Sequence, residues 1–246
     1  MMSNKKIARF EGINPMSLVT ANNLSKTYAL GELKVDALKE LNFEIDPASF
    51  VSFVGPSGSG KTTLLNLIGC LDKPTSGTLT VDGTDISSLN TRIAAAFRGR
   101  KIGFIFQDFN LIPVLTVYEN VGYPLLMVQN TPATERKKRI NALLEAVGMA
   151  DKKDKYPDQI SGGQKQRVAV ARALVKKPDL VLADEPTANL DSKTGENILN
   201  LMLELNRKTS TTFIYSTHDN RVMRLASRLI LLKDGQLESD SGNGNQ

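Results

Sequence analysis

The chain has 246 residues, of which 41% are hydrophobic and 23% are charged, so its composition is that of a globular protein. Eighteen glycines, ten prolines and a single cysteine exclude collagen-like, fibrous and disulfide-scaffold proteins. No stretch approaches the roughly 18–20 apolar residues of a membrane-spanning helix. The net charge of +5 is too mild to indicate nucleic-acid binding. The length predicts one large domain, or one domain with a substantial insertion.

The first third of the chain is typical of strands. A short β-compatible segment covers 18–28, and alternating apolar residues predict a half-buried strand at 41–45. FVSFV at 50–54 is almost continuously apolar, which predicts a strand buried on both faces, as in a parallel sheet. The spacing becomes helical from Lys61 onwards.

Two further strand signals follow before the chain becomes helical. Leu79 and Val81 precede Asp82-Gly83, which is a hairpin turn signal. KIGFIF at 101–106 predicts another buried strand.

The middle of the chain predicts helices. Thr116 and Glu119 form a possible capping box, and Thr131-Pro132 opens a helix that Gly148 would terminate. A further helix begins at Ser161 and ends before Pro178. We therefore expect a helical insertion over 108–177.

The last third returns to α/β alternation. Strands are predicted at 180–183, 212–215 and 229–232, and a stripe of apolar residues predicts a helix around 198–205. The sequence thus predicts an α/β domain over 17–238. Its core, over 17–107 and 178–238, has a mainly parallel sheet and an N-terminal antiparallel β region. We expect an N-terminal extension at 1–16 and a disordered tail at 239–246.

GPSGSGKT at 55–62 matches the pattern of a phosphate-binding loop. Glycines let the backbone wrap around phosphates, and the following helix N-terminus adds partial positive charge. Lys61 would reach the β- and γ-phosphates, and the hydroxyl of Thr62 would hold Mg²⁺. The pattern can arise by chance, but here it follows a buried strand and opens an apolar helix, as the function requires.

LVLADE at 180–185 places Asp184 and Glu185 at the carboxyl end of a second buried strand. In a parallel sheet that end faces the phosphate loop. Asp184 would help to hold Mg²⁺, and Glu185 would polarise an attacking water. The alternative is a pair of solvated charges at a strand end.

SGGQ at 161–164 fits a capping box, and a well-capped helix is the simplest interpretation. However, Gly162 and Gly163 leave the first-turn N–H groups uncovered, so an anion could bind there. This second anion site could serve another nucleotide, or the same kind of nucleotide held by a second subunit.

Two polar residues follow other predicted strands. The single histidine, His218, comes after 212–215, and Gln107 comes after 101–106. A lone histidine is more often structural than catalytic, but its position at the end of a strand favours function.

The order of these motifs resembles the ATP-binding cassette (ABC) family, the nucleotide-binding subunits of ABC transporters. GPSGSGKT at 55–62 resembles the Walker A motif, and LVLADE at 180–185 resembles Walker B. IFQD, which contains Gln107, resembles the Q-loop, and ISGGQKQR at 160–167 resembles the family signature. ANLD at 188–191 resembles the D-loop, and His218 resembles the switch histidine. The resemblance covers about 17–237 and implies a P-loop NTPase core. Ile160 replaces the usual leucine of the signature.

The resemblance implies ATP and Mg²⁺ as cofactors. It implies nucleotide contacts from Tyr28, Gly55, Ser57, Gly58, Ser59, Gly60, Lys61, Thr62, Thr63, Ser161, Gly162, Gly163, Gln164 and Asp191. It implies Glu185, His218 and Gln107 as catalytic residues, and Thr62, Gln107 and Asp184 as metal ligands. Tyr28 would stack on adenine.

The resemblance also implies partners. Two cassettes would pair head-to-tail as a homodimer, with each ATP between the Walker A of one and the signature of the other. The dimer would power an integral membrane permease, so we expect a cytoplasmic protein bound peripherally at the inner face of the membrane. No nucleic-acid partner is expected.

The segment GFIFQDFNLIPVLTVYENVGYPLL is similar to the lipoprotein-release and macrolide- or peptide-export branch, although polar amino acid importers share much of it. Two alternatives to a transporter ATPase remain. One is an ABC ATPase acting on nucleic acid or ribosomes, which usually carries two cassettes. The other is a non-hydrolysing regulatory module, which the presence of Lys61, Glu185 and His218 argues against.

Overall fold

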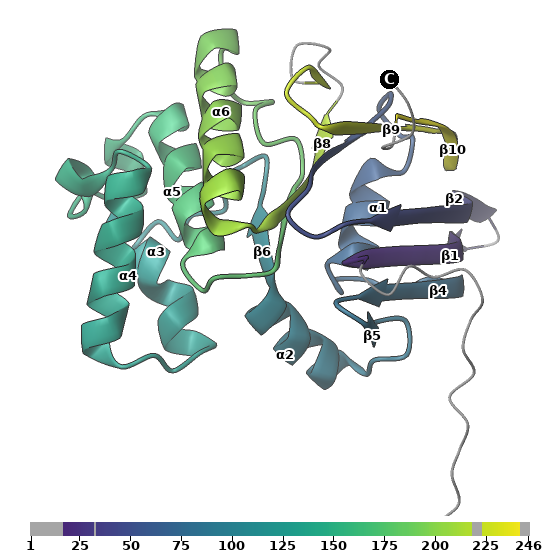
Figure 1. Cartoon of the computed structure of the whole chain (residues 1–246), viewed down its shortest axis with the longest axis horizontal. Helices are drawn as coiled ribbons and strands as arrows, with labels where there is room; N and C mark the ends of the chain where they lie inside the picture. Colours follow the sequence, from purple (N-terminus) through teal and green to yellow (C-terminus); the bar gives the residue numbers. More distant parts are fainter. Residues whose placement is uncertain (1–16, 32, 218–222, 242–246) are drawn as a thin grey trace, which may run out of the picture.

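Two β-sheets and a group of helices make up the molecule, which is a computed structural model that describes residues 17–31, 33–217 and 223–241 (Figure 1). The smaller sheet is antiparallel, with the order β2-β1-β4-β5. Its strands are β1 (Val19–Leu30), β2 (Leu33–Ile45), β4 (Ser76–Val81) and β5 (Thr84–Asp85). This sheet is the predicted N-terminal antiparallel region.

The larger sheet has the order β10-β9-β3-β8-β7-β6, and only the β9–β10 pair is antiparallel. Its strands are β3 (Phe50–Val54), β6 (Ile102–Ile105), β7 (Leu180–Ala183), β8 (Thr212–Thr217), β9 (Arg228–Lys233) and β10 (Gln236–Asp240). The predicted mainly parallel sheet is therefore confirmed.

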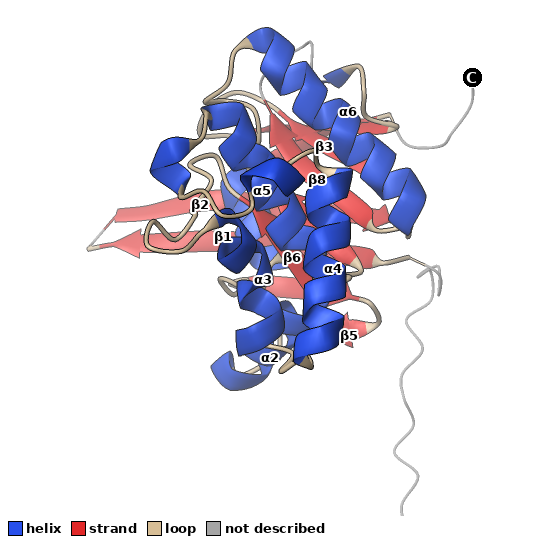
Figure 2. Cartoon of the chain, turned by 90° about the vertical axis from the view of Figure 1, so that its left-hand side faces the viewer, coloured by secondary structure: helices blue, strands red, loops and turns tan. Residues whose placement is uncertain are grey.

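The helices are α1 (Lys61–Ile68), α2 (Thr91–Lys101), α3 (Val117–Met127), α4 (Ala133–Ala146), α5 (Gly162–Leu174) and α6 (Ser192–Thr209). Two short 3-10 turns, Ala150–Lys152 and Pro157–Gln159, lie between α4 and α5. Helices α3, α4 and α5 all fall within the predicted insertion, and they gather on one side of the sheet (Figure 2).

The parallel strands separate two hydrophobic cores. Phe213 and Tyr215 of β8 belong to the core formed with α3–α6, whereas Ile214, between them, belongs to the core formed with α1 and the antiparallel sheet. This alternation follows from the two-residue period of a strand. Burial on both faces explains why most residues of the predicted parallel strands are apolar, without the alternation of a half-buried strand.

Three sequence-based boundaries or elements need correction. Helix α2 was not predicted, because Ala94 is the one buried residue of its described side chains and it shows no strong apolar stripe. Lys101 ends α2 rather than starting a strand. The strand β10 continues to Asp240, two residues into the expected tail, where the carboxylate of Asp240 pairs with Arg228.

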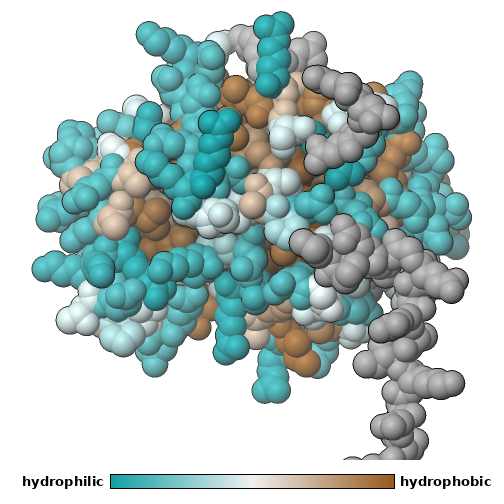
Figure 3. All heavy atoms as spheres, viewed as in Figure 1, coloured by the Kyte–Doolittle hydropathy of each residue, from teal (hydrophilic) through white to brown (hydrophobic). Residues whose placement is uncertain are grey.

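Within the described ranges, no helix combines the length and apolar composition that a bilayer crossing requires. Hydrophilic side chains cover most of the face shown in Figure 3, with smaller hydrophobic areas between them.

Helices α5 and α6 approach closely at Gly163. A Cβ added at Gly163 would lie 2.5 Å from Cγ2 of Thr194, whereas one added at Gly162 would meet Leu190 at an ordinary 3.5 Å. Thr194 is β-branched, so its methyl group has little freedom to move away. The glycine at 163 is therefore required by packing, whatever else it does.

We predict that Gly163→Ala lowers the free energy of unfolding by about 1–3 kcal/mol, because the added methyl group overpacks the contact with α6. Urea unfolding measures the change. Gly162→Ala is the matched control and should not destabilise the chain. Adding Thr194→Ser to Gly163→Ala should restore stability, and a failure of this rescue would contradict the packing explanation.

Candidate functional site

The carboxyl ends of the parallel strands form the edge on which the predicted site residues gather. The phosphate-loop sequence follows β3, Gln107 follows β6 and Asp184 follows β7. Parallel strands in one sheet end at one edge, and ligands bind in the crevice beyond that edge. The topology therefore brings together motifs that lie more than 120 residues apart.

A pocket of about 770 Å³ opens at this edge. Eight of the predicted residues line it: Ser57, Gly58, Gly60, Lys61, Thr62, Thr63, Gln107 and Glu185. The volume falls within the usual range for sites of small molecules and cofactors. The pocket also has lining residues that sequence reasoning missed: Val35, Asp36, Ala37, Lys39, Pro56, Ala188, Asp234 and Gly235. No motif marks most of these, because they reach the pocket only through the fold.

The loop between β3 and α1 closes around the ammonium group of Lys61. This side chain is only 6% exposed, and its Nζ donates to the carbonyl oxygens of Gly55 at 2.8 Å and Pro56 at 3.0 Å. Gly60 has a φ of +103°, and a Cβ there would lie 2.6 Å from the carbonyl oxygen of Ala37. The conformation and the close approach both require glycine at this position.

Asp184 connects the phosphate loop to the strand β8. Its Oδ1 accepts hydrogen bonds from Oγ1 of Thr62 at 3.2 Å and from Oγ of Ser216 at 2.6 Å. The hydroxyl of Ser216 also accepts from the backbone N–H of Glu185 at 2.9 Å. Ser216 was not predicted as a site residue. It lies at the end of β8, two residues before the only histidine, and this position in the sequence could have indicated it.

Glu185 adopts an uncommon backbone conformation. Its φ is +46°, in the left-handed region that non-glycine residues seldom adopt. Such strain is found at functional sites, where surrounding contacts maintain it. The contacts here include the Ser216 hydroxyl on its N–H and the Ala188 N–H on its carbonyl oxygen, at 3.2 Å.

Gln107 lies where the core chain enters the helical insertion. Its backbone carbonyl accepts from Nδ2 of Asn189 at 3.1 Å, and the same amide donates to Oδ1 of Asp108 at 2.9 Å. Asn189 belongs to the ANLD segment, so this segment holds the Gln107 backbone within the same chain.

The remaining phosphate-loop residues and Tyr28 do not line the pocket. Ser59 is 2% exposed and its hydroxyl points into the protein, so its predicted nucleotide contact has no side-chain support. Tyr28 donates from its hydroxyl to Asp72 at 2.8 Å, and Nζ of Lys26 lies 4.7 Å from its ring centroid. Partial burial and the Asp72 carboxylate raise the pKa of the Tyr28 phenol.

The SGGQ segment lies away from the pocket: none of Ser161, Gly162, Gly163 and Gln164 lines it. The predicted capping box is present, because Ser161 Oγ accepts from the Gln164 N–H and the Gln164 side chain accepts from the Ser161 N–H. Asp191 also lies away from the pocket. It caps α6, and hydrogen bonds from Thr194 lower the pKa of its carboxyl.

His218 lies outside the described residues. The strand that precedes it, β8, ends at Thr217 on the same sheet edge as Asp184.

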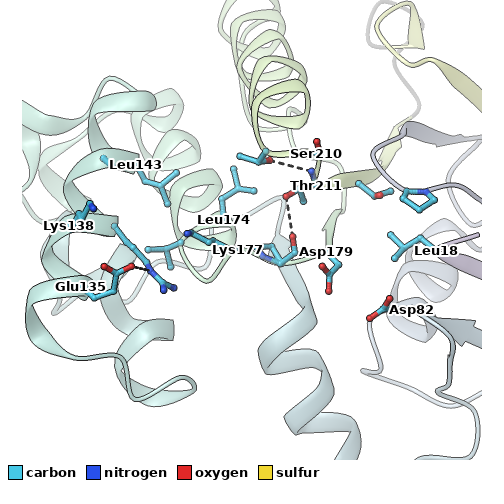
Figure 4. Close-up of a pocket in the computed structure, with 17 residues that line it drawn as sticks. Leu18, Asp82, Glu135, Lys138, Leu143, Leu174, Lys177, Asp179, Ser210 and Thr211 are labelled. Carbon is cyan, nitrogen blue, oxygen red and sulfur yellow. Dashed lines mark hydrogen bonds and ion pairs between the residues drawn. The ribbon is translucent and has the colours of Figure 1, made fainter. Parts of the chain in front are cut away.

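A second pocket, of about 710 Å³, lies beside the amino ends of β7 and β8, away from the carboxyl ends that border the first pocket (Figure 4). Its lining includes Lys138, Lys177, Asp179 and Thr211, and none of the predicted site residues. Its position away from the carboxyl ends of the strands separates it from the site described above.

Comparison with known proteins now identifies the family. Residues 38–188 match the family model described as "ABC transporter". The chain is 45% identical over 228 residues to the macrolide export ATP-binding/permease protein MacB of Syntrophobacter fumaroxidans, and this match covers 92% of the chain but only 32% of that relative.

Other relatives match over nearly their whole length. The uncharacterized ABC transporter ATP-binding protein MJ0796 of Methanocaldococcus jannaschii is 46% identical, and the match covers 91% of this chain and 96% of that one. A dimeric structure of MJ0796 in a post-hydrolysis state bound to ADP and Pi superposes with a TM-score of 0.84 at 45% identity, covering 93% of this chain and all of that one. The chain therefore belongs to the ABC transporter family and is an ATP-binding cassette ATPase.

Proposed function

We propose that the pocket at the carboxyl edge of the sheet holds the triphosphate of ATP, with each lining side chain in a specific role. The observation that carries this proposal is the convergence of Lys61, Gln107 and Glu185 on one pocket beyond a parallel sheet. The ammonium of Lys61 would bind the β- and γ-phosphates in place of its present loop carbonyls. Glu185 would act as the general base on the attacking water, and Gln107 and His218 would contact the γ-phosphate or water.

Mg²⁺ would be held by Thr62 and Asp184, with Gln107 as a further ligand. The hydroxyl of Thr62 and the carboxylate of Asp184 are hard oxygen donors, and they already lie 3.2 Å apart. No group of three or more His, Cys, Asp or Glu side chains with metal-binding geometry occurs in the described part of the chain. Mg²⁺ is commonly held by one or two protein ligands together with substrate phosphates. Bound Mg²⁺ would neutralise phosphate charge during transfer.

A second copy of the chain would complete each nucleotide site. Ser161–Gln164 presents a helix N-terminus with glycines in its first turn, which suits an anion, yet none of these residues lines the chain's own pocket. The dimeric structure of MJ0796 bound to ADP and Pi supports a dimer. In the proposed homodimer the two chains would pair head-to-tail, with the segment facing the partner's ATP. Asp191, near the same surface, would contribute there, and Tyr28 would contact the base.

The dimer would act on an integral membrane permease, which would hold this chain peripherally at the inner face of the membrane. The relative MacB is named as a macrolide export ATP-binding/permease protein, which supports a permease partner and favours export. This chain spans about a third of the length of MacB. Exposed apolar side chains on and beside α3 offer a contact surface close to Gln107 in sequence: Val114, Tyr123, Leu126 and Met127. Nucleic acid is not proposed as a partner, because the net charge of +5 is mild.

We predict that Glu185→Gln lowers ATP turnover by about 10²–10⁴-fold, because the general base is lost while the phosphate contacts remain. Phosphate release measures turnover, and light scattering after size-exclusion chromatography measures ATP-dependent dimerisation. The variant should bind ATP and stay dimeric. Retained turnover would refute the role of Glu185.

Ser161→Arg tests the composite site in the Glu185→Gln background. It should bind ATP with normal affinity, since Ser161 is not in the chain's own pocket, but should not dimerise. Normal ATP-dependent dimerisation would argue against the head-to-tail arrangement.

We predict that Glu185→Gln, held closed by ATP and Mg²⁺, retains its permease during affinity purification from detergent-solubilised membranes. Mass spectrometry identifies the partner. A permease with few spans and a large extracytoplasmic domain is expected for the export branch. A small permease accompanied by a solute-binding protein would instead indicate an importer, and ribosomal or DNA-associated proteins without any permease would overturn the transport proposal.

A further inference from the structure

Gln166, on the second turn of α5, is buried without full hydrogen bonding. Its side chain is 0% exposed, and its Nε2 donates to the carbonyl oxygen of Pro186 at 2.7 Å. Its Oε1 is buried and has no hydrogen-bond partner within the described ranges. An unpaired buried acceptor is unfavourable, and an apolar side chain of similar length would avoid that cost. The amide therefore needs a role beyond packing.

The bond from Gln166 reaches the residue next to Glu185. The hydrogen bonds on the backbone here include three: the N–H of Glu185 donates to Ser216 Oγ, the N–H of Ala188 donates to the carbonyl of Glu185, and Gln166 donates to the carbonyl of Pro186. The first two come from the core sheet and from the segment itself. Only the third, among these three, comes from the helical insertion. It acts directly beside a residue whose φ of +46° needs support from its surroundings.

The same helix also holds the segment after Gln107. Arg172, six residues after Gln166 on α5, donates to the carbonyl oxygens of Phe109 at 2.8 Å and Asn110 at 2.5 Å. Phe109 and Asn110 are consecutive non-glycine residues with φ of +62° and +47°. Helix α5 is thus bonded to the backbone beside both Glu185 and Gln107.

We propose that Gln166 is a positioning residue that makes the placement of Glu185 depend on the orientation of α5. The proposal rests on the function above, in which the N-terminus of α5 binds the partner subunit's ATP. A helix moves as a rigid unit, so docking of Ser161–Gln164 on that nucleotide sets where the amide of Gln166 lies. The amide then fixes the carbonyl of Pro186 and, with it, the carboxylate of Glu185. Occupancy of one ATP site is in this way communicated to the general base of the other site.

The test is Gln166→Met, which keeps the length of the side chain but removes both the donor and the unpaired acceptor. We expect kcat for ATP to fall about 10- to 100-fold, since small displacements of a catalytic group cost that much. The KM for ATP should stay within about twofold, because the phosphate contacts are unchanged. ATP-dependent dimerisation in the Glu185→Gln background should also be unchanged, and the melting temperature should not fall.

Gln129→Met is the matched control. Gln129 also donates from its amide to a backbone carbonyl, that of Lys176, at 3.0 Å, but it does so at the far end of α5. It should keep the wild-type kcat. An unchanged kcat in Gln166→Met, or equal losses in both variants, would overturn the proposal.

Hydrogen exchange gives a readout that does not depend on turnover. In Gln166→Met the peptide covering 184–190 should exchange faster than in the wild type, because the segment loses its hydrogen bond from Gln166. Unchanged exchange would count against the proposal. Glu185→Gln is assayed in parallel: if it retains turnover, the base assignment itself has failed, which separates that failure from a failure of the Gln166 link.

Discussion

One carboxylate oxygen, Oδ1 of Asp184, connects the segments that form the proposed nucleotide site. It accepts the hydroxyl of Thr62 from the first turn of α1 and the hydroxyl of Ser216 from the end of β8. These bonds tie three neighbouring segments at one edge of the sheet, and the Ser216 hydroxyl extends the connection to the backbone of Glu185. They are charge-assisted hydrogen bonds, which are stronger than bonds between neutral groups. The position of the phosphate loop relative to Glu185 therefore follows from this carboxylate.

The parallel sheet makes that arrangement possible because its strands are buried on both faces. Phe213 and Ile214, adjacent in β8, enter different cores, so the strand cannot slip by one residue without exchanging the two faces. A fixed register places Thr217, Val54 and Ala183 at the same edge. Apolar packing thus places the ends of the strands, and the hydrogen bonds of Asp184 connect the segments that follow them.

Much of this could be predicted because the signals were local. A glycine-rich loop between a buried strand and an apolar helix, and two carboxylates after another buried strand, fix both the element types and the edge at which they meet. Helix α2 was missed because a helix that buries little of its surface lacks the apolar stripe on which such predictions depend. Ser216 and Gln166 were missed for a different reason. Their importance arises from contacts between segments about 20 to 30 residues apart, and no spacing rule encodes such contacts.

The separation of Ser161–Gln164 from the pocket has a further consequence for how one chain can work. In the proposed dimer, a second copy of the chain supplies the other half of each nucleotide site. Two successive turns of α5 would then have different roles: the first turn would face the partner, whereas Gln166 on the second turn donates to Pro186 within the same chain. A side chain with a satisfied donor and an unsatisfied acceptor is a poor choice for stability alone. It is a reasonable choice where a hydrogen bond must link the position of the proposed general base to the position of the helix.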